Sequence, residues 1–192
     1  MRRFAVVGHR AATAGDFSLN DLPGSAGRMD ILCRCAAASL FLSHGLRRDA
    51  ECYLVLCGEP APPKTVLFRG GEVRSLSPDE RSVGGMIKSA LAIPCGALFR
   101  ESAPGIYVRR GGLERLLAEV SIAVLEEDGS DVRAAPSLPE GFLLSDHENF
   151  SPEECALIEG LPRFSLGPRS LHADHAIAVL QNELDRRECG WT

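Results

Sequence analysis

The sequence predicts an α/β fold with a mostly parallel sheet flanked by helices. Short apolar runs such as 2–9 and 51–58 lack the strict alternation of half-buried strands, which indicates strands buried on both faces. Segments with the apolar spacing of helices separate these runs, and a long helical pattern occupies 171–187. Strands that alternate with helices in this way are typical of layered α/β proteins.

The first half of the chain is expected to contain a strand at 2–9, a helix at 28–45, a strand at 51–58 and a hairpin at 64–76. The apolar stripe of the helix is expected to consist of Ile31, Cys35, Ala38 and Leu42. Gly45 marks the end of this helix, because glycine favours the conformation that stops helices. Gly70 and Gly71 would take the positive φ angles that the hairpin turn needs.

The second half begins with a helix pattern at 77–93, in which Ser77, Pro78 and Glu80 form a predicted capping box. Ser151, Pro152 and Glu154 repeat the same pattern. The other expected elements are an irregular stretch at 94–112, a helix at 113–120, a strand at 121–127, a loop at 128–141, short strands at 142–145 and 163–167, and a helix at 171–187 whose apolar face is Ala173, Ile177, Leu180 and Leu184.

Size and composition restrict the class of protein. A chain of 192 residues with 45% hydrophobic content suits one domain spanning 1–192. The net charge of −5 argues against a basic protein that coats nucleic acid, although a local basic patch could still bind RNA. No apolar run approaches the roughly 20 residues that span a bilayer, and the apolar stretch at 4–7 is too short for a signal peptide. We therefore expect a cytoplasmic protein without membrane contact.

The seven cysteines contain no C-x-x-C pair, which argues against a structural zinc site. Most are expected to be small buried groups in a reducing compartment. His172 and His175 share one helical face, but capping and surface exposure explain them better than a metal does. We expect no metal ion.

Two strand ends in the last third could hold a ligand, because open α/β sheets bind ligands at the carboxyl ends of their strands. One is "FLLSDHENF" and the other is "RFSLGPRSLHADHA". Neither contains a dinucleotide fingerprint or a P-loop. A flat group such as adenine would suit this place, with its edge on backbone atoms and its faces covered by Leu144, Leu166 and Leu171.

The segment 15–30, "GDFSLNDLPGSAGRMD", is too polar for a core and too rich in turn formers for a regular element. It nevertheless contains Asp16, Asn20, Asp21, Arg28 and Asp30. Asp30 fits the first turn of the following helix. The other four side chains form either a surface loop or part of a site.

Four motifs in order make the chain recognisable: "GDFSLNDLPGSAGRMDILCRC", "LSPDERS", "LLSDH" and "SLGPRSLHADHAIAVLQNELDR". Together they resemble the archaeal tRNA pseudouridine-54 N1-methyltransferase family and its bacterial relatives, which belong to the SPOUT class. The resemblance extends through nearly the whole chain.

This resemblance implies a deep C-terminal trefoil knot, with the knot and an S-adenosylmethionine site within about 120–192, and a homodimer. Carried over to this sequence, the cofactor-binding residues are Leu144, Ser165, Leu166, Gly167, Leu171 and Ala176. The family commonly has a cysteine where this chain has Ala176, so the affinity for the cofactor could differ.

The implied reaction is N1-methylation of pseudouridine in RNA, which requires the loss of the N1 proton to a base. Asp16, Asp21 and Asp79 are the candidate carboxylates, although Asp79 could simply complement a helix dipole. Arg28 is expected to position the base or a phosphate, and Asn20 and Arg81 are further candidates for substrate contact. Two alternatives remain open: the same chemistry on another RNA such as ribosomal RNA, and a non-catalytic module that binds RNA or a nucleotide.

Overall fold

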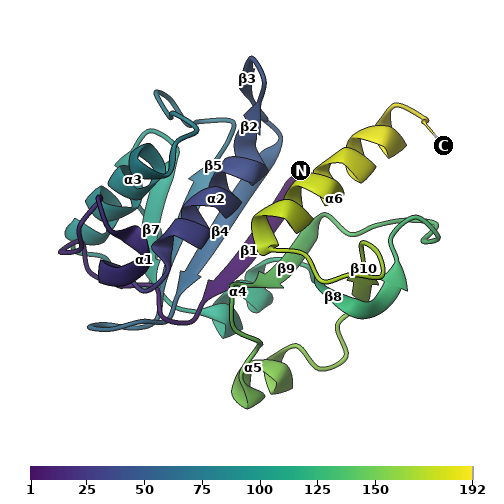
Figure 1. Ribbon diagram of the computed structural model, residues 1–192. Coiled ribbons are helices and arrows are strands. Elements are labelled where there is room, and N and C mark those ends of the chain that lie inside the picture. Colours follow the sequence, from purple (N-terminus) through teal and green to yellow (C-terminus); the bar gives the residue numbers. More distant parts are fainter. Residues whose placement is uncertain (192) are drawn as a thin grey trace.

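The computed structural model describes residues 1–191 and has a central eight-stranded sheet with helices on both faces (Figure 1). The strand order is β10-β8-β9-β1-β4-β5-β7-β6. The five strands from β10 to β4 are parallel, while β5, β7 and β6 continue the sheet in antiparallel pairs. This arrangement confirms the mostly parallel α/β architecture.

The strands of the large sheet are β1 (Arg2–Gly8), β4 (Ala50–Leu56), β5 (Lys64–Arg69), β6 (Arg100–Ala103), β7 (Ile106–Arg110), β8 (Ile122–Asp131), β9 (Gly141–Ser145) and β10 (Arg163–Ser165). A small hairpin is formed by β2 (Phe41–Leu42) and β3 (Gly45–Leu46). The helices are α1 (Leu22–Ser25), α2 (Met29–Leu40), α3 (Glu80–Ala92), α4 (Leu113–Glu119), α5 (Pro152–Leu157) and α6 (Ala173–Glu188).

Both faces of the sheet are covered, which explains why its central strands are apolar throughout. Phe4 and Val6 of β1 pack into the core shared with α2, α3 and α6. Ala5 and Val7 point to the other face, where the core includes Leu116 of α4. Successive side chains of a strand alternate between faces, so a strand covered on both sides reads as one continuous apolar run.

The C-terminal helix α6 packs beside α2 in front of the sheet (Figure 1). Ala173, Ile177 and Leu180 are buried as predicted, and Leu184 packs against the same core. A buried polar link adds to this packing, because Gln181 donates to the Ser39 carbonyl at 2.8 Å and accepts from Arg2 at 2.8 Å. This link fixes the middle of α6 to α2 and to the amino end of β1.

Several local predictions were wrong. The helix α2 ends at Leu40 rather than near Gly45, and Leu42 is exposed in the small β2–β3 hairpin. The strand β5 pairs with β4 and β7, so the turn at Gly70-Gly71 does not join two strands of a hairpin, and neither glycine takes the predicted positive φ angle. The stretch 94–112 is not irregular, since it contains the β6–β7 hairpin.

Only one of the two predicted capping boxes was found. Ser151 caps α5, accepting from the Glu154 N–H at 3.2 Å, and the Glu154 carboxylate accepts from the Ser151 N–H at 2.8 Å. The other box was wrong: α3 begins at Glu80, and its N-cap is Asp79, whose carboxylate accepts from the Ser82 N–H at 2.8 Å. An aspartate caps as well as a serine, so the sequence offered two competing caps two residues apart.

Candidate functional site

A cavity of about 580 Å³ lies where β9 and β10 end and α6 begins. All six residues predicted to contact the cofactor line it: Leu144, Ser165, Leu166, Gly167, Leu171 and Ala176. They come from three segments that are up to 32 positions apart (176 − 144). The volume falls within the range of roughly 300–1,000 Å³ that is usual for small-molecule sites.

The geometry at Gly167 keeps one wall of this cavity open. Its φ angle is 145°, which side chains other than glycine rarely adopt, and an added Cβ would meet no atom within 4 Å. Ser165 holds this turn, because its hydroxyl accepts from the Gly167 N–H at 3.2 Å and donates to the Gly167 carbonyl at 3.0 Å. The backbone can therefore approach a bound ligand closely here.

The lining of the cavity combines leucine side chains with carboxylates. Four acidic residues contribute to it: Glu126, Glu127, Asp146 and Glu148. Glu126 is paired with Arg163 at 2.5 Å, and Glu127 accepts a hydrogen bond from Ser170. Apolar walls with polar groups at the rim suit a ligand that has a flat ring and polar substituents.

Asp146, at the end of β9, is the most buried of these carboxylates. It lies 2.8 Å from Nδ1 of His9, whose Nε2 lies 2.8 Å from the Glu154 carboxylate. The hydrogen bond with Asp146, followed by that with Glu154, raises the pKa of His9 to about 9. Burial by itself would raise the pKa of Asp146, but hydrogen bonds from His9 and the Glu148 N–H keep it below its ordinary value. His9 and Asp146 therefore form a charged pair at neutral pH.

The predicted substrate segment 15–30 does not line this cavity within residues 1–191. The Asp16 carboxylate is exposed and has no polar partner among the described residues. Asp21 is the N-cap of α1, with its carboxylate 3.0 Å from the Gly24 N–H. Asn20 accepts a hydrogen bond from Arg81, which joins two residues that were both predicted to contact substrate.

The hydrogen bonds with Asp30, and to a smaller extent the charge of Asp146 in the cavity wall, raise the pKa of Arg28. Its backbone is left-handed (φ 64°), and its Nε and Nη2 each lie 3.1 Å from one oxygen of the buried Asp30. Asp30 lies in the first turn of α2, as predicted. The guanidinium is thus held in place while 40% of the side chain stays exposed.

Arg34 connects this segment to the start of α6. Its guanidinium lies 3.1 Å from Asp30, 2.9 Å from Glu80 and 3.4 Å from Asp174. Asp174 follows Ala173, which lines the cavity. The ion pairs of Arg34 therefore join α2 and α3 to the rim of the cavity, and they give Glu80 a role other than the predicted capping.

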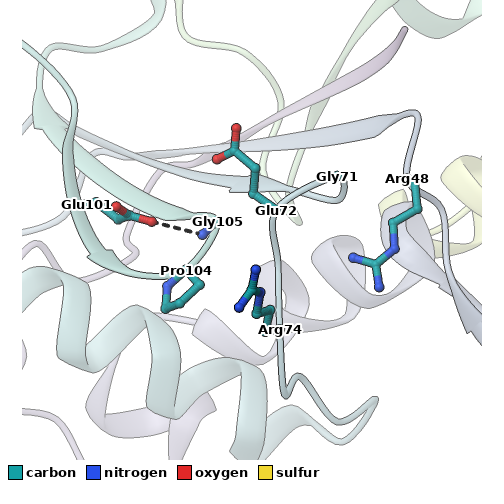
Figure 2. Close-up of a pocket in the computed structure, with 7 residues that line it drawn as sticks. All are labelled: Arg48, Gly71, Glu72, Arg74, Glu101, Pro104 and Gly105. Atoms are coloured by element: carbon teal, nitrogen blue, oxygen red, sulfur yellow. Dashed lines mark hydrogen bonds between the residues drawn. The ribbon is translucent and has the colours of Figure 1, made fainter.

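A second cavity, of about 640 Å³, lies at the opposite end of the sheet, near the turn between β6 and β7 (Figure 2). The Arg74 side chain lies between those of Pro104 and Arg48 (Figure 2). Arg48 donates to the carbonyls of Gly70 and Val73, each at 2.9 Å. Among the described residues, no predicted site residue lines this cavity.

Three residues near the first cavity were missed by reasoning from sequence. Asp146 belongs to the "LLSDH" motif but was not among the predicted site residues, and Arg169 lies at the exposed rim of the cavity. His9 could have been found from its position directly after β1, because ligand sites in parallel sheets lie at the carboxyl ends of the strands.

His172 and His175, which share one helical face in the sequence pattern, lie edge to face with ring centroids 5.7 Å apart. The part of the chain from 1 to 191 contains no group of three or more side chains placed to bind a metal ion.

Comparison with known proteins identifies the class. A family model described as "Putative SAM-dependent RNA methyltransferase" matches residues 1–189. The chain therefore belongs to this family of RNA methyltransferases, whose cofactor is S-adenosylmethionine. The crystal structure of Archaeoglobus fulgidus Nep1 bound to S-adenosylhomocysteine has a similar fold, with a TM-score of 0.65, 12% identity, and coverage of 98% of this chain and 99% of that chain.

Curated relatives narrow the family further. The tRNA (pseudouridine(54)-N(1))-methyltransferase of Methanocorpusculum labreanum is 56% identical, over 97% of this chain and 98% of its own length. The protein of that name from Methanospirillum hungatei is 53% identical over 100% of both chains. At these identities the chain belongs to the tRNA (pseudouridine(54)-N(1))-methyltransferase family, which confirms the resemblance found in its motifs.

Proposed function

We propose that this protein transfers a methyl group from S-adenosylmethionine to N1 of the pseudouridine at position 54 of tRNA. The observation that carries the proposal is the convergence of six residues from three distant segments on one cavity in a chain of this family. The names of the relatives specify tRNA as the RNA, pseudouridine 54 as the base and N1 as the atom that is methylated.

The cofactor is proposed to bind in the cavity between β9, β10 and the start of α6. Leu144, Leu166 and Leu171 would cover the faces of the adenine ring, and the backbone at Ser165 and Gly167 would address its edge. Ala176 leaves more room than a cysteine would. Bound there, the cofactor supplies an electrophilic methyl group.

The reaction also needs a base that removes the N1 proton and groups that hold the RNA. Pseudouridine has an N1–H that uridine lacks, so a carboxylate within hydrogen-bond reach of N1 makes that atom a nucleophile. Asp16, Asp21 and Asp79 are the proposed candidates. Asp16 fits best, because its carboxylate is exposed and uncommitted within residues 1–191, whereas Asp21 and Asp79 already cap helices.

The RNA-contacting surface is proposed to comprise the segment 15–30 together with Arg81. Arg28 presents an immobilised guanidinium, and Arg81 and Asn20 present a hydrogen-bonded pair. Planar guanidinium groups suit phosphates and carbonyl oxygens. The extruded base would extend from this surface to the cavity, as enzymes that modify bases require.

The chain is further proposed to form one domain with a deep trefoil knot within about 120–192, although Thr192 lies outside the described residues. Two contacts support this path: the Val132 N–H donates to the Ser165 carbonyl at 3.0 Å, and Arg133 pairs with Glu183 at 2.5 Å. The segment after β8 thus contacts both the end of β10 and the helix α6. A crystal structure that traces this path without threading would contradict the proposal.

A homodimer and a cytoplasmic location are also proposed. Leu171, which precedes α6, and Val179 of α6 are exposed by 44% and 37% and offer apolar area for contact with a second chain. Light scattering after size exclusion would show whether two chains associate. All seven cysteines are free thiols, which suits a reducing compartment. Within residues 1–191, every helix is too short or too polar to span a bilayer.

Nucleoside mass spectrometry tests this function. A tRNA transcript with pseudouridine in its T-loop, incubated with protein and cofactor, should yield 1-methylpseudouridine after digestion. If the methyl group appeared only on ribosomal RNA offered in parallel, the proposed substrate would be wrong while the chemistry stood. If the protein bound the cofactor and methylated neither RNA, it would be a binding module.

A further inference from the structure

His9 joins two carboxylates that stand at either end of one wall of the proposed cofactor cavity. Its ring is bonded to Asp146 and Glu154 at 2.8 Å on both sides, and its backbone N–H donates to Asp146 at 3.1 Å. The side chains of His9, Asp146 and Glu154 are only 12%, 1% and 14% exposed. This three-residue arrangement, which we name the His9 clamp, is therefore largely shielded from water.

Each carboxylate of the His9 clamp also organises nearby backbone. Asp146 accepts from the Glu148 N–H at 2.9 Å, and Glu154 accepts from the Ser151 N–H at 2.8 Å. The chain between these two anchors, 146–150, lines the cavity along its whole length. His9 is thus the link between strand β1 and both ends of this wall.

The bonding pattern requires His9 to carry both ring protons. An ionised carboxylate only accepts hydrogen bonds, so a ring nitrogen facing one must donate, and a ring with two such neighbours is an imidazolium. The other ionisable groups facing the clamp are His147, Glu148 with its partner Arg10, Cys57 at the end of β4, and Arg28 beyond Asp146. The His9 ring itself is in direct contact with Asp146 and Glu154, at 2.8 Å each.

We propose that His9 is a positioning residue whose imidazolium holds 146–150 as a wall of the cofactor cavity, so that cofactor affinity depends on the His9 charge. This inference rests on the proposed placement of S-adenosylmethionine in that cavity. Loss of the ring proton leaves two buried carboxylates facing each other with one donor fewer, and the wall then loosens. No contact of His9 with substrate or with the reacting atoms is implied.

The first test compares His9→Gln with the wild type. Glutamine is uncharged and cannot donate to both carboxylates from the position of the ring. Calorimetry with S-adenosylhomocysteine should show an affinity lower by about tenfold. Hydrogen exchange of the cofactor-free protein should be faster in 146–151, and kcat at saturating cofactor should be nearly unchanged. His44→Gln is the matched control, because His44 lies exposed in the β2–β3 hairpin.

The second test uses Glu154→Gln, which removes a charge but keeps an acceptor for the Ser151 N–H and for His9. The affinity of the wild type should fall as pH rises through about 9, where His9 loses its proton. In Glu154→Gln the same fall should occur at lower pH, with near-normal affinity in the acidic range. A merely structural role for Glu154 would not move this midpoint.

Different results would contradict the role of His9 and the placement of the cofactor. If His9→Gln bound as tightly as the wild type, with unchanged exchange in 146–151 and no shift of the midpoint in Glu154→Gln, the inference about His9 would be wrong. If the wild type bound but Gly167→Ala in the cavity had no effect, the proposed cofactor site itself would be wrong.

Discussion

Arg28 and Asp30 form a two-pronged ion pair, in which Nε and Nη2 each lie 3.1 Å from a separate carboxylate oxygen. Asp30 is buried, whereas Arg28 is partly exposed at the end of the proposed RNA surface. A guanidinium fixed in this way loses little further entropy when it contacts a phosphate. The pair is therefore suited to binding rather than to stability alone.

Replacing Arg28 by alanine should weaken tRNA binding by roughly fivefold to tenfold and leave the affinity for S-adenosylmethionine unchanged. Filter binding and calorimetry measure the two affinities. Arg115→Ala is the matched control, since Arg115 is also partly exposed and lies 3.2 Å from Glu119 on the opposite face of the sheet. A loss of cofactor affinity alone would mean that Arg28 serves the cavity.

Gly167→Ala should reduce cofactor affinity by about tenfold or more, because alanine avoids a φ of 145° and the turn at Ser165 would shift. Gly160→Ala is a close control: its φ is 80°, and an added Cβ there also meets nothing within 4 Å. Both variants introduce backbone strain, but only Gly167 lines the cavity. Equal affinities in the two variants would contradict the assigned cofactor site.

The three candidate bases can be separated by their asparagine variants. Asparagine caps helices as well as aspartate does, so Asp21→Asn and Asp79→Asn should retain their folds and most activity. Asp16→Asn should lower kcat by about a hundredfold if Asp16 takes the N1 proton. Single-turnover methyl transfer measures the effect. A full-rate Asp16→Asn together with an inactive Asp21→Asn would transfer the role to Asp21.

His9 makes folding stability dependent on pH. Its pKa rises from 6.5 in the unfolded chain to about 9 in the folded one, so its contribution is complete below 6.5 and is lost as pH rises through about 9. Urea unfolding of the wild type and His9→Gln should show a difference in unfolding free energy that shrinks by about 3 kcal/mol between roughly pH 6 and pH 10. A difference independent of pH would contradict a charged His9.

RNA binding should depend on salt even though the chain is acidic overall. Each phosphate contacted by an arginine should contribute about −0.7 to the slope of log affinity against log salt concentration. Arg28→Ala and Arg81→Ala should each make the slope less steep by about that amount. A flat response in the wild type would argue against an RNA substrate bound through its backbone.

Much of the fold could be predicted because its signals are local. The run 2–9 and the spacing of Ala173, Ile177 and Leu180 reflect burial that each element experiences along its own length. The β6–β7 hairpin was missed because both strands are short and β6 is polar and largely exposed. Such a segment is extended only because β5 offers it an edge.

The site was predictable only where a motif carried it. Leu144 and Gly167 could be assigned from the resemblance, and both line the cavity. His9 is 137 positions from Asp146 and 145 positions from Glu154 in the sequence. No local sequence pattern could therefore predict that these three side chains are in contact. The ion pairs of Arg34 are equally non-local, since one of them reaches Asp174.

Methyl transfer to two tRNA transcripts that differ only at position 54 of the T-loop tests the central claim most directly. One transcript carries pseudouridine there and the other carries uridine, and both are offered with labelled S-adenosylmethionine. We expect rapid incorporation into the pseudouridine transcript and none above background into the uridine transcript, which has no N1 proton to lose. Equal methylation of both transcripts would contradict this claim.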